Sequence, residues 1–504
     1  MPDTLASRDP LRLVPDASRV VTQLFVPGHA IAGQGGGAKV TGVVEHVLEL
    51  DDTEVSVELD ALTARFGGRH RDLTGTFLRH ADRIAARLPA GTEVSGDRRL
   101  LLGATFTHEY SVEAAALCNP SVVPAPDQSG LADGALRFVM SVRQIGEGHR
   151  SSIGFRSGVV DRRGVVTIDP PGPFATTGSV TPGLLDAEPF RDVADDRDGG
   201  LATWVLDGLG PTFTVDELAI RLSELEAQRD IRRNVTQSVD AIREIAARTY
   251  DVRFDASTSL GERVLYPSTG TESNGMEDAR FLRFVDDDGA ATYYATYTAF
   301  DGRAITQQLL ATADFTSFAV SPLRGPATDN KGLALCPRRI GGQCFALSRH
   351  DGATNAVACS DDIRRWSTVS PLDVPTEPWE AVQVGNCGPP IETADGWLVL
   401  THGVGAMRTY SIGALLLDLD DPTVVVGRTT RPLITPQPDE QDGYVPNVVY
   451  SCGALRHGDL LLVPFGIGDA NVGFATFVID DVLAVMREHP TTTTRPDNGS
   501  RADA

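Results

Sequence analysis

Residues 275–284 read GMEDARFLRF, with two adjacent carboxylates and an arginine between a glycine and a run of strand-forming residues. A segment of similar texture, a punctuated start followed by apolar residues, recurs along the second half of the chain. The other copies are KGLALCPRRI (331–340), GNCGPPIET (385–393) and YVPNVVYSCG (444–453). Their spacing of roughly 50 to 60 residues is typical of the four-stranded blades of a β-propeller.

Short strand-like runs that end in Gly or Asp-Gly turns follow each of these segments. They are ATYYATYTAFDG (291–302), GQCFALSRHDG (342–352), GWLVLTHGVG (396–405) and GDLLLVPFGIGD (458–469). A fifth unit stands earlier and begins with ALCNPSVVP (116–124). The sequence therefore predicts an all-β five-bladed β-propeller, in which the first segments of all blades converge on one end of a central channel.

Two α-helical segments are added to the predicted propeller, over residues 52–89 and 214–249. Both carry apolar residues at spacings of three and four, and Thr214 with Glu217 forms a capping-box pattern at the start of the second. This second segment is an insertion between blades 1 and 2. The inserted helices either pack on the larger body or form a subunit contact.

The domain organisation follows from these patterns. We expect a mixed and helical extension over residues 1–104 and a catalytic propeller over residues 105–482. The polar segment over residues 483–504 is expected to be a disordered tail.

The net charge of the 504-residue chain is −23, from 68 acidic and 45 basic residues. This charge argues against nucleic acid or an anionic membrane as the main partner, but it allows a local basic pocket for a small anion. No apolar run of about 18 residues is present, and the N-terminus lacks the regions of a signal peptide, so we expect a cytoplasmic protein. The six cysteines form no C-x-x-C pair and match no zinc-ligand spacing, so no metal is expected.

Six segments of the chain together resemble glycoside hydrolase family 130. They are NGMEDARF, YTAFDG, NKGLALCPRRI, GPPIET with DGWLVLTHGV, GALLLDLDDP and VPNVVYSCGA, and the resemblance covers residues 105 to 482. It implies a five-bladed propeller that acts on β-mannosides. The family contains phosphorylases, which use inorganic phosphate as co-substrate and release α-mannose 1-phosphate with inversion, and related β-mannosidases. No cofactor is implied.

The resemblance assigns the role of general acid to Asp278, with the proton passing through a mannosyl hydroxyl. An inverting phosphorylase needs only this one carboxylic acid, because phosphate itself is the nucleophile. A protonated Asp278 at neutral pH requires a raised pKa, from burial or from a like charge such as Glu277. Strand alternation, however, would point Glu277 to the opposite face.

Further residues are assigned to the substrate by the same resemblance. Asn119, Asp301 and Asp469 match positions that contact sugar hydroxyls, a task that suits carboxylates because they accept hydrogen bonds strongly. Asp301 could equally belong to a plain Asp-Gly turn. Arg143, in the first blade, and Glu277 are the other expected substrate-binding residues.

The expected phosphate-binding residues are Lys331 and His402, which match family positions, together with three arginines. Lysine supplies a point charge and histidine a donor, and both suit a dianion. Two arginines common in the phosphorylases are not at their usual places, and Arg303 and Arg408 are close enough in sequence to replace them. Arg150 resembles another first-blade arginine that could face the pocket.

The missing arginines leave an inverting β-mannosidase as the alternative function, since a water nucleophile needs no anion site. Such an enzyme needs a second carboxylate, roughly 6.5–9.5 Å from the acid. Glu272, Glu392 and Asp442 are the unassigned candidates for this base. A carbohydrate-binding propeller without catalysis is the second alternative, and a homo-oligomer is possible in each case.

Overall fold

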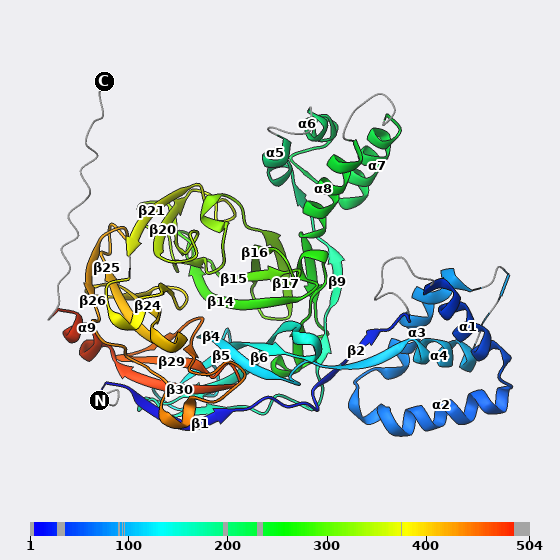
Figure 1. Ribbon diagram of the computed structural model, residues 1–504, viewed down its shortest axis with the longest axis horizontal. Helices are drawn as coiled ribbons and strands as arrows, with labels where there is room; N and C mark the ends of the chain where they lie inside the picture. The colour runs from blue at the N-terminus through cyan, green and yellow to red at the C-terminus, as the bar shows by residue number, and fades with distance from the viewer. Residues whose placement is uncertain are drawn as a thin grey trace.

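Antiparallel hairpins make up most of the structure, because strand-forming runs alternate with Asp-Gly and Gly turns along the chain. The computed structural model describes residues 5–27, 36–88, 91–92, 94, 96–194, 200–228, 235–373 and 375–487. Figure 1 shows sheets arranged around a common centre, with two helical units outside them. The prediction of a sheet-rich chain with added helices is thus confirmed.

The strands of the central body form four sheets, and we divide the largest, of 12 strands, at the single pairing of Gly275 with Ser151, which gives five groups. The first group contains β4 (Ala116–Pro124), β5 (Leu136–Ile145), β6 (Ser151–Val160) and β7 (Val166–Ile168). The second contains β14 (Gly275–Val285), β15 (Ala291–Phe300), β16 (Ile305–Thr312) and β17 (Ser317–Pro322), and is extended by β12 (Tyr250–Arg253) and β9 (Ser179–Pro182). The third contains β18 (Ala334–Leu335), β19 (Cys344–Ser348), β20 (Asn355–Ser360) and β21 (Thr368–Asp373).

The remaining two groups complete the central body. The fourth contains β22 (Gln383–Asn386), β23 (Ile391–Thr393), β24 (Gly396–Val404), β25 (Tyr410–Leu417) and β26 (Val425–Arg428). The fifth contains β27 (Val449–Tyr450), β28 (Leu455–His457), β29 (Leu460–Ile467), β30 (Asn471–Val478) and β1 (Ser7–Leu13). Two short strands, β8 (Thr176–Thr177) and β13 (Arg263–Leu265), join the sheet of the first group.

Each strand group contacts the next, and the fifth contacts the first. Backbone hydrogen bonds make this last contact, from Leu117 N to Ala470 O at 3.1 Å and from Cys452 N to Pro120 O at 2.8 Å. Buried aromatic side chains contribute to the core shared by the first and second groups, where the rings of Phe155 and Phe318 stack with centroids 5.7 Å apart. The side chains buried between neighbouring groups set the orientation of each group toward the centre.

The N-terminal strand β1 belongs to the fifth group, which corrects the predicted extension over residues 1–104. It pairs with β30 at the other end of the chain, and the two arginines of β1 reach Glu440, whose side chain is only 4% exposed. Glu440 ends the short 3-10 turn η9 (Pro438–Glu440) and also caps it. A pairing between the two chain ends leaves no local pattern, so the sequence did not indicate it.

Replacing Glu440 by glutamine is expected to lower the free energy of unfolding by about 2 kcal/mol, because a buried carboxylate with two charged partners is lost. Arg8 lies 2.5 Å and Arg12 2.9 Å from its oxygens. Urea denaturation of the purified variants would measure the change. Glu392→Gln is the matched control, since its pair with Arg338 is exposed and should be worth under about 1 kcal/mol. Equal losses in both variants would contradict a special role for Glu440.

The N-terminal helical unit contains α1 (Gly36–Glu49), α2 (Asp52–Phe66), α3 (Leu73–Ile84) and α4 (Gly96–Thr105). Apolar side chains from these helices form a core of their own. The unit leaves and rejoins the body through an antiparallel pair, β2 (Val20–Leu24) and β3 (Thr107–Ser111). The helices predicted over residues 52–89 are therefore present, and two more flank them.

The helical insertion is larger than the predicted segment at 214–249. It contains α5 (Glu188–Ala194), α6 (Leu201–Leu206), α7 (Val215–Glu226) and α8 (Val235–Ala247), with the small pair β10 (Leu185–Asp186) and β11 (Thr212–Phe213). The capping box of Thr214 and Glu217 is confirmed. Two of its helices, α5 and α6, are too short to show a clear apolar period, which is why the pattern missed them.

Helix α9 (Ile479–Arg487) follows the last strand and packs apolar residues against the fifth group. Residues 483–487 of the predicted tail are therefore helical, and residues 488–504 lie outside the described residues. Among the helices of the described ranges, none is both long and apolar enough to cross a membrane.

Candidate active site

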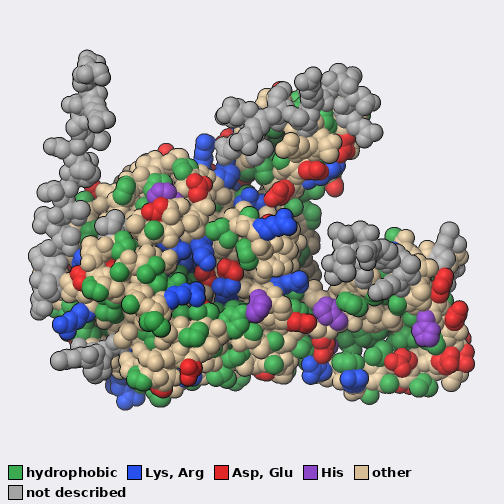
Figure 2. All heavy atoms as spheres, viewed as in Figure 1, with side chains coloured by type: hydrophobic (Ala, Val, Ile, Leu, Met, Phe, Trp, Pro, Cys, Tyr) green, Lys and Arg blue, Asp and Glu red, His purple; other side chains and the backbone are tan. Residues whose placement is uncertain are grey.

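A cavity of about 410 Å³ lies where the five strand groups converge. Its lining carries five basic side chains, Arg143, Arg280, Lys331, Arg349 and Arg408, and three carboxylates, Glu277, Asp278 and Asp469. Figure 2 shows basic and acidic side chains gathered in the hollow at the middle of the sheets. All five groups contribute to this lining, as the convergence of the blade-starting segments predicted.

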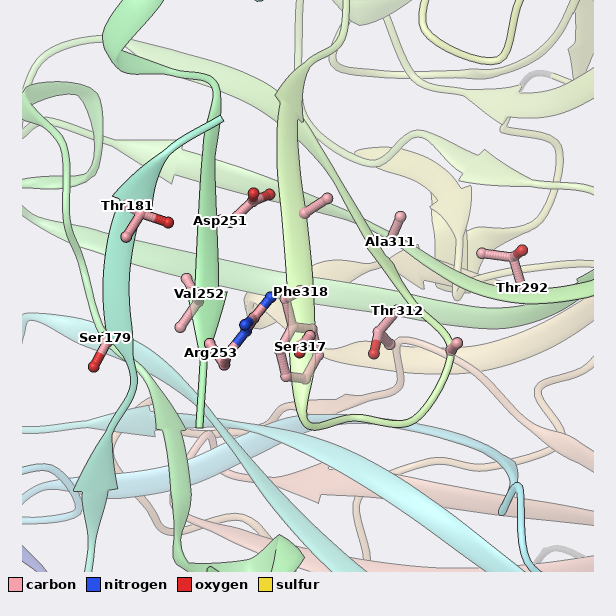
Figure 3. Close-up of a pocket in the computed structure, with 12 residues that line it drawn as sticks. Ser179, Thr181, Asp251, Val252, Arg253, Thr292, Ala311, Thr312, Ser317 and Phe318 are labelled. Atoms are coloured by element: carbon pink, nitrogen blue, oxygen red, sulfur yellow. The ribbon is translucent and has the colours of Figure 1, made fainter. Parts of the chain in front are cut away.

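A second hollow, of about 530 Å³, lies beside β9, β12 and β17 and is larger (Figure 3). Its lining is mostly small side chains, with Asp251 as its one carboxylate and Arg253 as its one cation among the described residues. It offers neither paired carboxylates nor a cluster of cations. The central cavity is therefore the better candidate for catalysis.

Two β-bulges aim side chains into the central cavity. The register of β14 shifts between Glu277 and Arg280, and the register of β4 shifts between Cys118 and Ser121. Asp278 and Asn119 lie in these bulges with φ of 55° and 48°, a left-handed conformation that Asp and Asn adopt more readily than other non-glycine residues. Because of its bulge, β14 presents adjacent Glu277 and Asp278 to the same cavity, where regular alternation would separate them.

Asp278 is held by several donors and is ionised in this state. Its Oδ1 accepts a hydrogen bond from Asn119 Nδ2 at 2.5 Å and lies 3.4 Å from Arg143 Nη1. Burial alone would favour the neutral form, but the charges of Arg143, Lys331 and Arg280 outweigh it and lower the pKa of Asp278 to about 2. The raised pKa that a protonated Asp278 would require is therefore not found.

Arg143 and Arg280 hold this wall of the cavity in place. Arg143 donates to Glu277 Oε1 at 2.5 Å and to Ser151 Oγ at 2.8 Å. Arg280 is 3% exposed and donates to the carbonyl oxygen of Asp278 at 3.0 Å and to the hydroxyl of Tyr450 at 2.8 Å. The segment is therefore part of the buried wall of the cavity and is not a solvated surface turn.

Asp469 is the carboxyl of the cavity whose pKa is raised, to about 6. Burial is the main cause, and the charge of Asp278 adds to it while Arg143 opposes it. Its carboxyl makes no hydrogen bond or ion pair with another described residue, and its backbone has φ of 46°. A carboxyl that faces a cavity without a protein partner is suited to accept hydroxyl groups of a ligand.

Asp469→Asn is expected to stabilise the protein near pH 7 but not near pH 4. Between the ordinary value of 3.8 and about 6, the folded state binds the Asp469 proton more tightly than the unfolded state does. The stability from this group is therefore present at low pH and is lost as pH rises through about 6, which corresponds to about 3 kcal/mol. Thermal melts of both proteins from pH 4 to 8 would measure the effect. A difference that does not vary with pH would contradict the assignment.

The other side of the cavity carries cations without paired carboxylates. The ammonium group of Lys331 forms no ion pair within the described ranges, and Arg349 Nε is buried there without a hydrogen-bond partner. Arg349 Nη1 lies 3.0 Å from His402 Nε2. A Cβ on Gly385 would lie 2.4 Å from the His402 ring and 2.9 Å from Arg349 Cδ. The glycine therefore leaves the space that the His402 and Arg349 side chains occupy.

His402 is fully buried and neutral. Burial lowers the pKa of His402 well below its ordinary value, and the charge of Arg349 lowers it further. Its Nδ1 lies 3.2 Å from the carbonyl oxygen of Asn386, so this nitrogen carries the proton and Nε2 accepts from Arg349. In this state His402 orients Arg349 and has no free donor for a dianion.

Most of the residues expected from the sequence meet in the central cavity. They are Asn119, Arg143, Glu277, Asp278, Lys331, His402, Arg408 and Asp469. Three expected residues do not line it. Asp301 is exposed and accepts hydrogen bonds from the backbone of its own turn, Arg303 is exposed in that same turn, and Arg150 donates to the hydroxyl of Tyr266 at 2.9 Å.

Sequence reasoning missed Arg349 and Tyr450. Arg349 directly follows β19. The cavity-lining residues Phe300 and Asp469 also stand at or just after the end of a strand, so this position could have indicated Arg349. The three carboxylates proposed as a hydrolytic base do not line the cavity. Glu272 is fully buried and accepts from two tyrosine hydroxyls, Glu392 pairs with Arg338, and Asp442 is exposed.

No group of three or more His, Cys, Asp or Glu side chains that could hold a metal ion is found within the described ranges.

The family model described as beta-1,4-mannooligosaccharide phosphorylase matches residues 240–488. A 1,2-beta-oligomannan phosphorylase of Thermoanaerobacter sp. (strain X514) is 34% identical over 227 residues, which are 44% of this chain and 75% of the relative. A beta-1,2-mannobiose phosphorylase of Listeria innocua is 32% identical over 228 residues, which are 44% of this chain and 62% of the relative.

Solved structures also match the chain. The beta-1,2-mannobiose phosphorylase of Listeria innocua in complex with beta-1,2-mannobiose aligns with a TM-score of 0.44 and 22% identity, over 75% of this chain and 94% of the solved one.

Proposed function

The chain belongs to glycoside hydrolase family 130, and from this premise we propose that it catalyses the phosphorolysis of β-mannosides by inorganic phosphate. The glycosidic C1–O bond breaks, a phosphate oxygen bonds to C1 from the opposite face, and a proton passes to the leaving oxygen. The products are α-mannose 1-phosphate and the remaining sugar. The relatives are named as enzymes, which speaks against a propeller that only binds carbohydrate.

The observation that carries this proposal is the surplus of positive charge in the cavity. Five basic side chains face three carboxylates there, although the whole chain has a net charge of −23. A neutral sugar and a water molecule need no such surplus, whereas a phosphate dianion does.

Each side of the cavity has its own part in the proposed reaction. Lys331 and Arg349 bind the phosphate, and His402 acts by orienting Arg349. Asn119 and Asp469 bind mannosyl hydroxyls on the other side, where Arg143 holds Glu277 in place. Arg408 also lines the cavity and adds positive charge.

Asp278 is the proposed acid, although the neighbouring cations lower its pKa. A bound phosphate dianion offsets the positive charge of Lys331, and a bound sugar excludes water. Both changes raise the pKa of Asp278, so that it takes up a proton and passes it through a mannosyl hydroxyl to the leaving oxygen.

We further propose that the five strand groups are the blades of a five-bladed β-propeller. The contact of each group with the next, and of the fifth with the first, supports this description. The pairing of β1 with β30 would then close the propeller with strands from both ends of the chain.

The deciding experiment is to incubate the enzyme with β-1,2-, β-1,3- and β-1,4-linked mannobioses, with and without inorganic phosphate. Phosphate-dependent release of α-mannose 1-phosphate, detected by phosphorus NMR, is expected. Free mannose formed at equal rates in both conditions would instead indicate a β-mannosidase. The candidate base of such an enzyme is Asp469, the cavity carboxyl that has no partner among the described residues.

A further inference from the structure

Two side chains from the first and fifth strand groups join at the mouth of the central cavity. The hydroxyl of Tyr444 and Nδ1 of His149 are joined by a hydrogen bond, and their ring centroids are 5.7 Å apart at 47°. Tyr444 lines the cavity and is 41% exposed. His149 stands in the turn between β5 and β6, in a left-handed conformation with φ of 63°. An exposed aromatic ring is thus held at the mouth of the site.

The segment that carries Tyr444 is fixed to the body at several points. Just before it, Glu440 pairs with Arg8 and Arg12 of β1. A Cβ on Gly443 would lie 2.4 Å from the carbonyl oxygen of Gly468, so the two backbones touch there. The backbone at Tyr444 is therefore held in place, and the hydrogen bond with His149 restricts rotation of the Tyr444 ring.

The order of the groups places this pair across the cavity from the phosphate side. Lys331 and Arg349 come from the third group, whereas His149 belongs to the first group and Tyr444 to the segment that leads into the fifth. Because the groups contact one another in cyclic order, the junction of the fifth and first lies opposite the third. In an inverting displacement the leaving group departs on the side opposite the nucleophile.

We propose that Tyr444, positioned by His149, forms the wall of the subsite for the leaving sugar and selects a pyranose there. This inference rests on the proposed function. The apolar face of a pyranose ring lies on the Tyr444 ring, and Ile145 and Val445 extend the apolar surface beside it. Tyr444 contacts the substrate, whereas His149 is a positioning residue that acts through Tyr444.

The test compares substrates that have a leaving sugar with one that has none. With the preferred β-mannobiose, Tyr444→Ala is expected to raise KM about tenfold, as is usual for the loss of an aromatic contact. With β-mannosyl fluoride and phosphate, C1–F breaks, C1–O forms and fluoride leaves, so the same variant should keep kcat/KM within about twofold of wild type. In the reverse reaction, KM for the acceptor sugar should rise and KM for α-mannose 1-phosphate should not.

The role of His149 is tested through a double-mutant cycle. His149→Ala and Tyr444→Phe should each raise KM for the disaccharide about threefold, and their combination should do no more than either alone. His457→Ala is the matched control, because His457 is a surface histidine bonded to the carbonyl oxygen of Gly134. Additive effects of the two changes would overturn the positioning role of His149.

Two outcomes separate this inference from the proposed function. Equal losses of Tyr444→Ala on the fluoride and on the disaccharide would overturn the assignment of Tyr444 to the leaving sugar, while phosphorolysis by wild type stands. A wild-type enzyme that forms no sugar phosphate from any β-mannoside would overturn the proposed function itself.

Discussion

Asp278→Asn is expected to lower kcat for phosphorolysis of a β-mannobiose by about a thousandfold, because an amide cannot donate the proton that the leaving oxygen needs. KM for phosphate should fall or stay the same, since the variant removes a negative charge from a cavity that binds an anion. Steady-state kinetics with phosphate and mannobiose varied in turn would measure both constants.

The identity of Asp278 as the acid is tested with a better leaving group. 2,4-Dinitrophenolate leaves without protonation, so Asp278→Asn should lose only about tenfold on the dinitrophenyl β-mannoside. Asp127→Asn, on the surface, is the control for the charge change itself. If the loss is the same on both substrates, Asp278 shapes the site but does not supply the proton.

The second large effect is expected at the phosphate side. Arg349→Met should raise KM for phosphate by about a hundredfold, because the variant removes the guanidinium group proposed to bind the anion. The Nε of this group is buried without a described partner. KM for the mannoside should change by less than about threefold, since Arg349 contacts no sugar in this arrangement. Lys331→Met should act in the same direction.

His402→Ala should raise KM for phosphate by a smaller factor, about tenfold, because the variant frees the Arg349 side chain to move without removing its charge. Arg163→Met is the matched control, as the Arg163 side chain is 77% exposed. A rise in KM for the mannoside with no change for phosphate would place the anion elsewhere in the cavity.

The residue types of the site could be predicted from sequence, but the distances and orientations between their side chains could not. Blocks such as GMEDARF carry Asp278 in a recognisable context. The low pKa of Asp278 arises mainly from the charges of Arg143 and Lys331, which lie far from it in sequence, with a smaller contribution from nearby Arg280. The shared orientation of Glu277 and Asp278 depends on a bulge, and a bulge depends on pairing with the neighbouring strand.

For the fold, too, the local elements could be predicted from sequence, but the pairing of distant segments could not. Turn residues and alternating apolar runs indicate hairpins, and the capping box of Thr214 indicates the start of α7, because both signals are local. The pairing of β1 with β30 joins the two ends of the chain and has no local signal. Asp301 was expected in the site because its Asp-Gly turn resembles a family block, but its carboxylate is used by the turn itself.

Both helical units are attached in the same way, and this has a consequence for how the chain is organised. Leu24 faces Thr107 across one strand pair, and Gly183 N donates to Thr249 O at 3.1 Å at the base of the other unit. Each unit therefore departs and returns at neighbouring points. A short hairpin loop could therefore replace either unit while every strand of the central body kept its neighbours.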